Sequence, residues 1–101
     1  MDAQAGLSDA TLSAVKAETA RAIAKHGVLH SAIGPGSDLY KLAILGEEFG
    51  EVCHALTYDS GEGLEELYKE LVQVSSVAAG WAQTVYERIL QGAINAVSSE
   101  T

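Results

Sequence analysis

The sequence has few of the residues that define several broad classes of protein. Its one cysteine, Cys53, cannot form an internal disulfide, so a reducing, cytoplasmic setting is the simplest expectation. Only six basic residues stand against 14 acidic ones, which gives a formal charge of −8. Binding to a nucleic-acid backbone or to an anionic membrane requires a basic face. The composition therefore argues against both partners.

Long apolar runs are also absent. No stretch approaches the roughly 20 apolar residues of a membrane span, and the N-terminus lacks the basic and apolar regions of a signal peptide. Nevertheless 48% of the chain is apolar, which predicts a folded domain rather than a disordered segment. We expect a single domain over residues 8–97, with flexible ends at 1–7 and 98–101. So small a domain buries only about two thirds of its unfolded surface, so oligomerisation is expected.

Hydrophobic periodicity predicts an all-α fold, a bundle of about three main helices. The first should cover about 9–26 and the second about 38–57. A third begins near residue 64, and its apolar stripe persists for about seven turns, with Gly80 and Gly92 as places where it can bend or end. No segment shows the period-two alternation of a strand.

The expected helix ends carry ordinary capping residues. Ser8 or Asp9 can cap the first helix, and Gly27 lies just past its end. Ser37 can cap the second helix, after a break rich in glycine. The single cysteine, Cys53, lies within that second helix and is expected to be a small buried apolar residue.

The second helix combines an apolar stripe with a run of glutamates. Its apolar side chains recur at steps of three and four residues, at Leu39, Leu42, Leu45, Phe49, Val52 and Leu56. Glu47, Glu48 and Glu51 lie on the other side of the helix. The simplest interpretation of such a run is a solvated helix face.

Two details favour a functional interpretation of these glutamates. Ile44 and Ala55 bracket them along the same side of the helix, where a solvated face would carry polar residues. Only Lys41 is near enough along the helix to pair with them, and like charges one turn apart are mildly destabilising. A bound cation would turn that repulsion into attraction.

The third helix repeats the pattern with Glu66, Glu70, Gln73 and Val77 along one edge of its apolar stripe. Helices joined by a short break normally pack antiparallel, so the pair Glu70/Gln73 can face Glu48 and Glu51. Hard oxygen ligands in this number suit Mg²⁺, with Mn²⁺ as the alternative ion. An acidic protein that binds an anionic nucleotide needs such a cation between the two.

These residues resemble the signature of a known family. Glu47-Glu48-Phe49-Gly50-Glu51, followed after 18 residues by Glu70-Leu71-Val72-Gln73, is similar to the EExxE…ExxD pattern of the MazG-like all-α nucleoside triphosphate pyrophosphohydrolases. The segments Lys25-His26-Gly27 and His30-Ser31 are similar to the loop that precedes this signature. The resemblance covers about residues 20–85.

The resemblance implies a hydrolase that cuts a (deoxy)nucleoside triphosphate into the monophosphate and pyrophosphate. Family members are dimers, or tetramers made of dimers, so the helical bundle would be completed by dimerisation. The matching metal ligands are Glu48, Glu51, Glu70 and the last signature position, Gln73. Glu47 matches the first signature glutamate, as an extra ligand or as the base that orients water, and Glu47 and Glu48 are the expected catalytic residues.

Gln73 departs from the signature, which has Asp at this position. An amide oxygen can coordinate a metal but carries no charge, and Glu66, one turn before Glu70, could compensate. The candidate substrate contacts are the basic residues Lys25, His26, Lys41 and Lys69. The alternative interpretation is that these are ordinary side chains of the solvated surface.

Two other functions are open at this point. Glu51 and His54 form an ExxH motif, and a homodimer would bring two copies of it together with two copies of Glu70, the ligand set of a di-iron carboxylate bundle. The second alternative is a non-catalytic helical module for oligomerisation or nucleotide sensing.

Overall fold

The computed structural model describes residues 6–28, 31–57 and 63–99, and within these ranges it contains three helices and no strand. They are α1 (Asp9–His26), α2 (Asp38–Thr57) and α3 (Leu64–Ser99). The prediction of an all-α fold is confirmed. α3 runs without interruption through Gly80 and Gly92, and it includes residues 98–99 at its end.

The helix ends follow from local hydrogen bonding. At the start of α1 the hydroxyl of Ser8 accepts a hydrogen bond of 3.1 Å from the backbone N–H of Thr11. Gly27 follows α1 at a φ of +81°, which favours glycine. The hydroxyl of Ser37 accepts from the backbone N–H of Tyr40, 3.1 Å away, and so caps α2.

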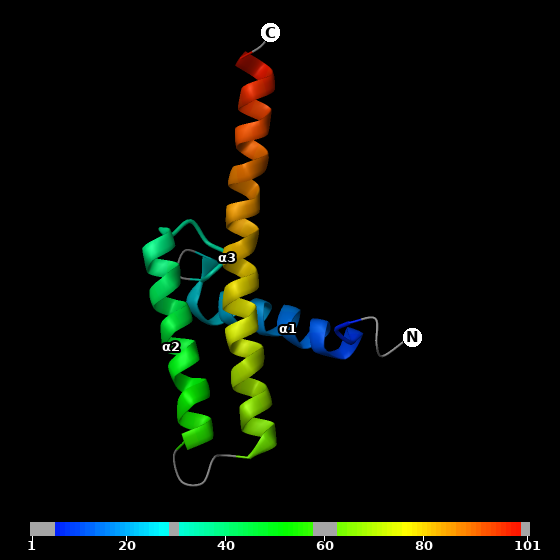
Figure 1. Cartoon of the computed structure of the whole chain (residues 1–101), viewed down its shortest axis with the longest axis vertical. Helices are drawn as coiled ribbons and strands as arrows, with labels where there is room; N and C mark the ends of the chain where they lie inside the picture. The colour runs from blue at the N-terminus through cyan, green and yellow to red at the C-terminus, as the bar shows by residue number, and fades with distance from the viewer. Residues whose placement is uncertain (1–5, 29–30, 58–62, 100–101) are drawn as a thin grey trace.

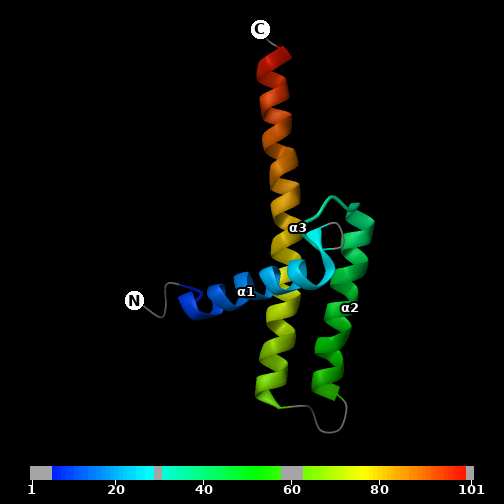
Figure 2. The same cartoon turned by 180° about the vertical axis from the view of Figure 1, so that it is seen from behind.

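α3 is the element that both other helices contact. Figures 1 and 2 show α2 antiparallel to the first half of α3, α1 crossing α3 on one face, and the last part of α3 projecting beyond both. The principal dimensions are 62 × 36 × 23 Å. The radius of gyration of 16.7 Å exceeds the value of about 13 Å for a compact chain of this length. The projecting end of α3 accounts for the elongation.

The face of α2 that packs on α3 includes only part of its apolar stripe. Lys41, Val52 and Ala55 are the buried residues of this helix. Leu39 and Phe49, from the stripe, are 79% and 61% exposed. Cys53 is exposed as well, so the expectation that it is buried is wrong.

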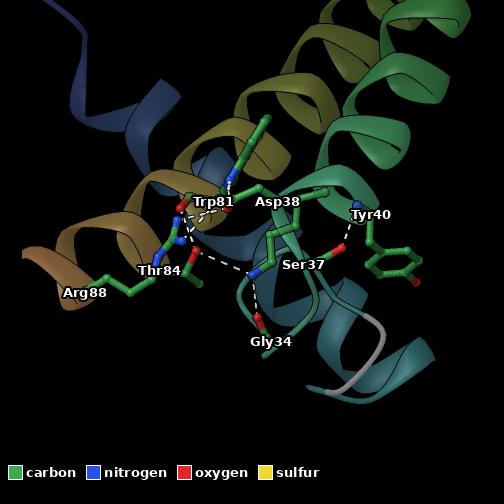
Figure 3. Close-up of polar contacts among 8 residues, drawn as sticks. Gly34, Ser37, Asp38, Tyr40, Trp81, Thr84 and Arg88 are labelled. Carbon is green, nitrogen blue, oxygen red and sulfur yellow. Dashed lines mark hydrogen bonds and ion pairs between the residues drawn. The ribbon is translucent and has the colours of Figure 1, made fainter.

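Lys41 and Asp38 join the start of α2 to the middle of α3. Figure 3 shows Asp38 beside Trp81 and Arg88. Lys41 is only 1% exposed, and its ammonium group donates to the carbonyl of Gly34 and, at 3.4 Å, to the hydroxyl of Thr84. The Asp38 carboxylate accepts hydrogen bonds from the Trp81 indole N–H at 2.9 Å and from the Arg88 guanidinium. These hydrogen bonds, that of Trp81 first, lower the pKa of Asp38.

The turn at residues 31–34 packs directly against α3 at Gly80. A Cβ atom at position 80 would lie 3.3 Å from the carbonyl carbon of Ala32 and from the backbone nitrogen of Ile33. Glycine at this position therefore lets the turn approach the helix backbone. No helix within the described stretches has both the length and the apolar character needed to cross a bilayer.

We expect Gly80→Ala and Gly92→Ala to change the free energy of unfolding in opposite directions. Alanine in a helix interior is favoured over glycine by about 1 kcal/mol, and a Cβ at Gly92 meets no atom within 4 Å. At Gly80 the crowding against the turn should exceed that gain and leave a net loss of about 1–2 kcal/mol. Urea denaturation of both variants measures the difference, and equal stabilisation would contradict the close approach at Gly80.

Candidate functional site

The Gln73 side chain lies between two carboxylates that come from different helices. In the amide orientation that satisfies its neighbours, its Nε2 atom donates to Oε2 of Glu48 and to Oε2 of Glu70, each at 3.1 Å. Glu70 on α3 is buried, and Glu48 on α2 is half-buried. The expected approach of Glu48 to Glu70 and Gln73 is therefore present within a single chain.

The surroundings of Glu48 disfavour its negative charge. Its pKa is raised, first by desolvation and then by the nearby carboxylates of Glu70, Glu18, Glu51 and Glu47. Burial penalises a charged carboxyl, and like charges add to that penalty. A divalent cation among these carboxylates would remove much of the repulsion.

The donor chemistry of this cluster fits a hard divalent cation, since carboxylate oxygens are the ligands that Mg²⁺ takes. Glu48 and Glu70 are held together by one amide group, which brings two carboxylates from opposite helices to one place. Glu51 lies one helical turn beyond Glu48 and is exposed. Among residues 6–28, 31–57 and 63–99, no group of three His, Cys, Asp or Glu side chains is assembled for a metal. Further ligands would have to join Glu48 and Glu70 by side-chain rotation.

Next to this cluster is a cleft of about 300 Å³ between the three helices and the turn at residues 31–33. This volume is at the small end of the range for ligand pockets. Its lining is apolar at Ala22, Ile33, Ile44 and Val77. Its polar lining comes from all three helices and includes Glu18, Thr19, Arg21, His26, Glu47, Glu48, Gln73 and Ser76. The cleft thus borders Glu47 and Glu48, two of the glutamates that the sequence singled out.

The sequence did not predict that side chains from the middle of α1 line this cleft. Glu18 and Arg21 form an ion pair with distances of 2.5 and 2.9 Å, at i, i+3 spacing. In the sequence such a pair is indistinguishable from an ordinary surface pair. Thr19 and Ser76 are likewise unremarkable until the folded chain brings α1 across α3.

The four basic candidates for substrate contact occupy different places. His26 lines the cleft and is exposed. Lys25 is exposed at the end of α1, and the Lys69 ammonium lies 4.0 Å from the Glu66 carboxylate on the solvent side of α3. Lys41 is buried in its contacts with the turn and α3. Of these, only His26 is part of the cleft lining.

Comparison of the chain with protein-family models, with curated proteins and with solved structures found no match. The resemblance to the MazG-like family therefore rests on the signature residues themselves. Of these, the structure brings Glu48, Glu70 and Gln73 together and puts Glu47 beside them in the cleft lining. Glu51 and His54, the residues of the ExxH motif, are both exposed on α2.

We expect Glu48→Gln to raise the melting temperature at neutral pH in the absence of metal. The pKa of Glu48 in the folded state lies above its ordinary value of 4.5. The free energy of unfolding therefore falls as the pH rises above 4.5, because the unfolded chain ionises more readily than the folded one. Glutamine removes the charge and can still accept from Gln73. Well below pH 4.5 Glu48 is protonated in both the folded and the unfolded state, and the difference in melting temperature between the variant and the wild type should vanish.

Thermal unfolding followed by circular dichroism, between pH 3.5 and pH 8, measures this effect. Glu87→Gln is the matched control, because Glu87 is an exposed carboxylate of α3 outside the cluster. A loss of stability in Glu48→Gln at pH 7 would show that the site already neutralises the carboxylate.

Proposed function

We propose that this protein is a Mg²⁺-dependent nucleoside triphosphate pyrophosphohydrolase of the MazG-like kind, which releases a nucleoside monophosphate and pyrophosphate. The single observation that carries the proposal is the meeting of Glu48 and Glu70 across Gln73, beside a cleft of ligand size. An isolated run of glutamates on a solvated helix face would not turn a carboxylate toward the neighbouring helix. A cytoplasmic location is part of the same proposal.

In this proposal Glu48, Glu51 and Glu70 hold the metal ion. When bound, the ion neutralises charge on the phosphate oxygens and makes a bound water more acidic. Glu47, in the lining of the cleft, orients the attacking water. Mn²⁺ could replace Mg²⁺ because it takes the same oxygen ligands.

Gln73 has two compatible roles in the proposed site. Its amide nitrogen donates to Glu48 and Glu70, and these hydrogen bonds hold two mutually repelling carboxylates near each other. Its amide oxygen is the fourth metal ligand in this proposal, the role that the signature gives to Asp. The carboxylate of Glu66, the residue that could compensate for Gln73, lies 4.0 Å from the ammonium group of Lys69.

We further propose that the bundle is completed by a second copy of the chain, as a homodimer or as a tetramer made of two dimers. Large apolar side chains are exposed along both long helices: Leu39, Leu42, Phe49 and Leu56 on α2, and Leu64, Leu71, Tyr86, Ile89, Leu90, Ile94 and Val97 on α3. Exposed apolar surface on this scale marks an interaction surface. A second copy supplies a complementary apolar face by symmetry.

The enzyme assay follows pyrophosphate release from each canonical and modified triphosphate in the presence of Mg²⁺. We expect turnover by the wild type, and a loss of at least about 100-fold in kcat/KM for Glu51→Gln and Glu70→Gln, because each removes a charge aimed at the metal. The Glu87→Gln control should retain full activity. Turnover that survives both substitutions would exclude this site.

A non-catalytic helical module is the second candidate, and the exposed apolar faces favour it, since they are suited to assembly with or without catalysis. A chain that oligomerises but turns over no triphosphate would support this module. The di-iron alternative requires iron to co-purify with the protein and to be lost in His54→Ala. Metal analysis of the purified protein therefore separates the di-iron alternative from the other two functions.

We expect Phe49→Asp to shift the protein toward the monomer in sedimentation velocity experiments. Burying a phenylalanine side chain contributes about 1.5–3 kcal/mol, so its loss should raise the dissociation constant at least about tenfold. Ala20→Glu, at an exposed position of α1, is the control and should leave the association unchanged. A wild-type chain that is monomeric at the concentrations used in the turnover assay would contradict the proposed assembly.

A further inference from the structure

A pair of hydroxyl groups joins α1 to α3 in the lining of the cleft. Thr19 Oγ1 and Ser76 Oγ lie 2.7 Å apart, although the two residues are 57 positions apart in the sequence. Ser76 is 6% exposed, and Thr19 is half-buried. This pair is a direct polar link between the two helices.

The hydrogen-bonding partners of the two hydroxyl groups indicate which of them donates in this contact. Thr19 Oγ1 donates its only proton to the backbone carbonyl of Val15, at 3.1 Å. The hydrogen bond to Val15 favours Ser76 as the donor and Thr19 as the acceptor in the short contact, in which either hydroxyl is geometrically able to donate. With this assignment both hydroxyl protons are directed into the protein, and the pair offers oxygen lone pairs to a ligand in the cleft.

Other polar groups in the cleft strengthen this bias toward accepting. The Arg21 guanidinium donates to the Glu18 carboxylate, and the Gln73 amide donates to Glu48 and Glu70. Glu47 and Glu48 bring further carboxylate oxygens to the lining. The cleft thus offers many acceptors, while the Gln73 amide and two N–H groups of Arg21 are engaged within the protein; the rings of His26 and Tyr40 also line the cleft.

The apolar part of the lining lies beside the acceptors. Ala22, Ile33, Ile44 and Val77 supply apolar walls in a cleft of about 300 Å³. A ligand that fits has apolar faces and an edge that donates hydrogen bonds. A nucleobase has this chemistry, with flat ring faces and an exocyclic amino group or ring N–H at the edge.

We propose that this cleft holds the nucleobase of the substrate and that Ser76, with Thr19 fixing its proton, selects a base edge that donates a hydrogen bond. This inference rests on the proposed function, since it assigns the base end of the same substrate. Ser76 is a specificity-determining residue here, and Thr19 is a positioning residue that acts through it.

The test compares nucleosides that differ only in the donor. Full-length ¹⁵N-labelled protein without metal is titrated with cytidine and with its analogue that lacks the 4-amino group. Adenosine and its analogue that lacks the 6-amino group form a second pair. Shifts of the Thr19, Ser76 and Val77 amide signals report binding. We expect each amino-bearing nucleoside to bind about tenfold more tightly than its analogue, the effect of one hydrogen bond.

Two variants and one control separate the role of the hydroxyl pair from a general effect on folding. In Thr19→Val the Ser76 hydroxyl loses its acceptor and can donate to the analogue. The ratio of the affinities for the amino-bearing nucleoside and its analogue should therefore fall toward one. Ser76→Ala should also bring the ratio toward one by removing the acceptor. Ser75→Ala is the matched control, because the Ser75 hydroxyl is exposed and donates to the carbonyl of Leu71. It should keep the ratio of the wild type.

Equal affinities within both pairs for the wild type would overturn the inference, as would a ratio that survives in both variants. Absence of any shift in the cleft signals at millimolar nucleoside would overturn it as well. Because the titration needs neither metal nor turnover, its outcome is independent of the pyrophosphate assay. A protein without turnover can show the donor preference, and an active enzyme can lack it.

Discussion

The packing of α2 against α3 buries charged groups together with the apolar side chains of Val52 and Ala55. Lys41 is buried at one end of this contact, and Glu48 meets Glu70 through Gln73 nearer its middle. Burying charge is costly, so this arrangement needs compensating hydrogen bonds. The same geometry leaves many apolar side chains of both helices exposed and gathers the carboxylates, so the candidate site and the candidate interface both follow from it.

Local features of the fold could be predicted from the sequence because their physical causes lie within a few residues. Ser8, Gly27 and Ser37 act on neighbouring backbone groups, and the structure confirms them at the helix ends. The approach of Glu48 to Gln73 could also be anticipated, since helical spacing and an antiparallel connection were enough to infer it.

Features that depend on distant segments could not be predicted in the same way. The burial of Lys41 depends on the Gly34 carbonyl and on Thr84, which is 43 residues away. The contact of Thr19 with Ser76 depends on where α1 crosses α3. The exposure of Cys53 depends on the face of α2 that turns inward, and the apolar pattern of the helix alone predicted a different face.

The projecting end of α3 has a consequence for dynamics. Residues 86–99 are all exposed within one chain, and beyond the contact of Arg88 with Asp38 their helix depends mainly on its own backbone hydrogen bonds. Isolated helices of this length are marginal in water. In a separate chain this segment should open frequently and exchange its amide hydrogens rapidly, whereas in an assembly that covers it the exchange should slow. Order in the last four turns of the protein would then depend on protein concentration.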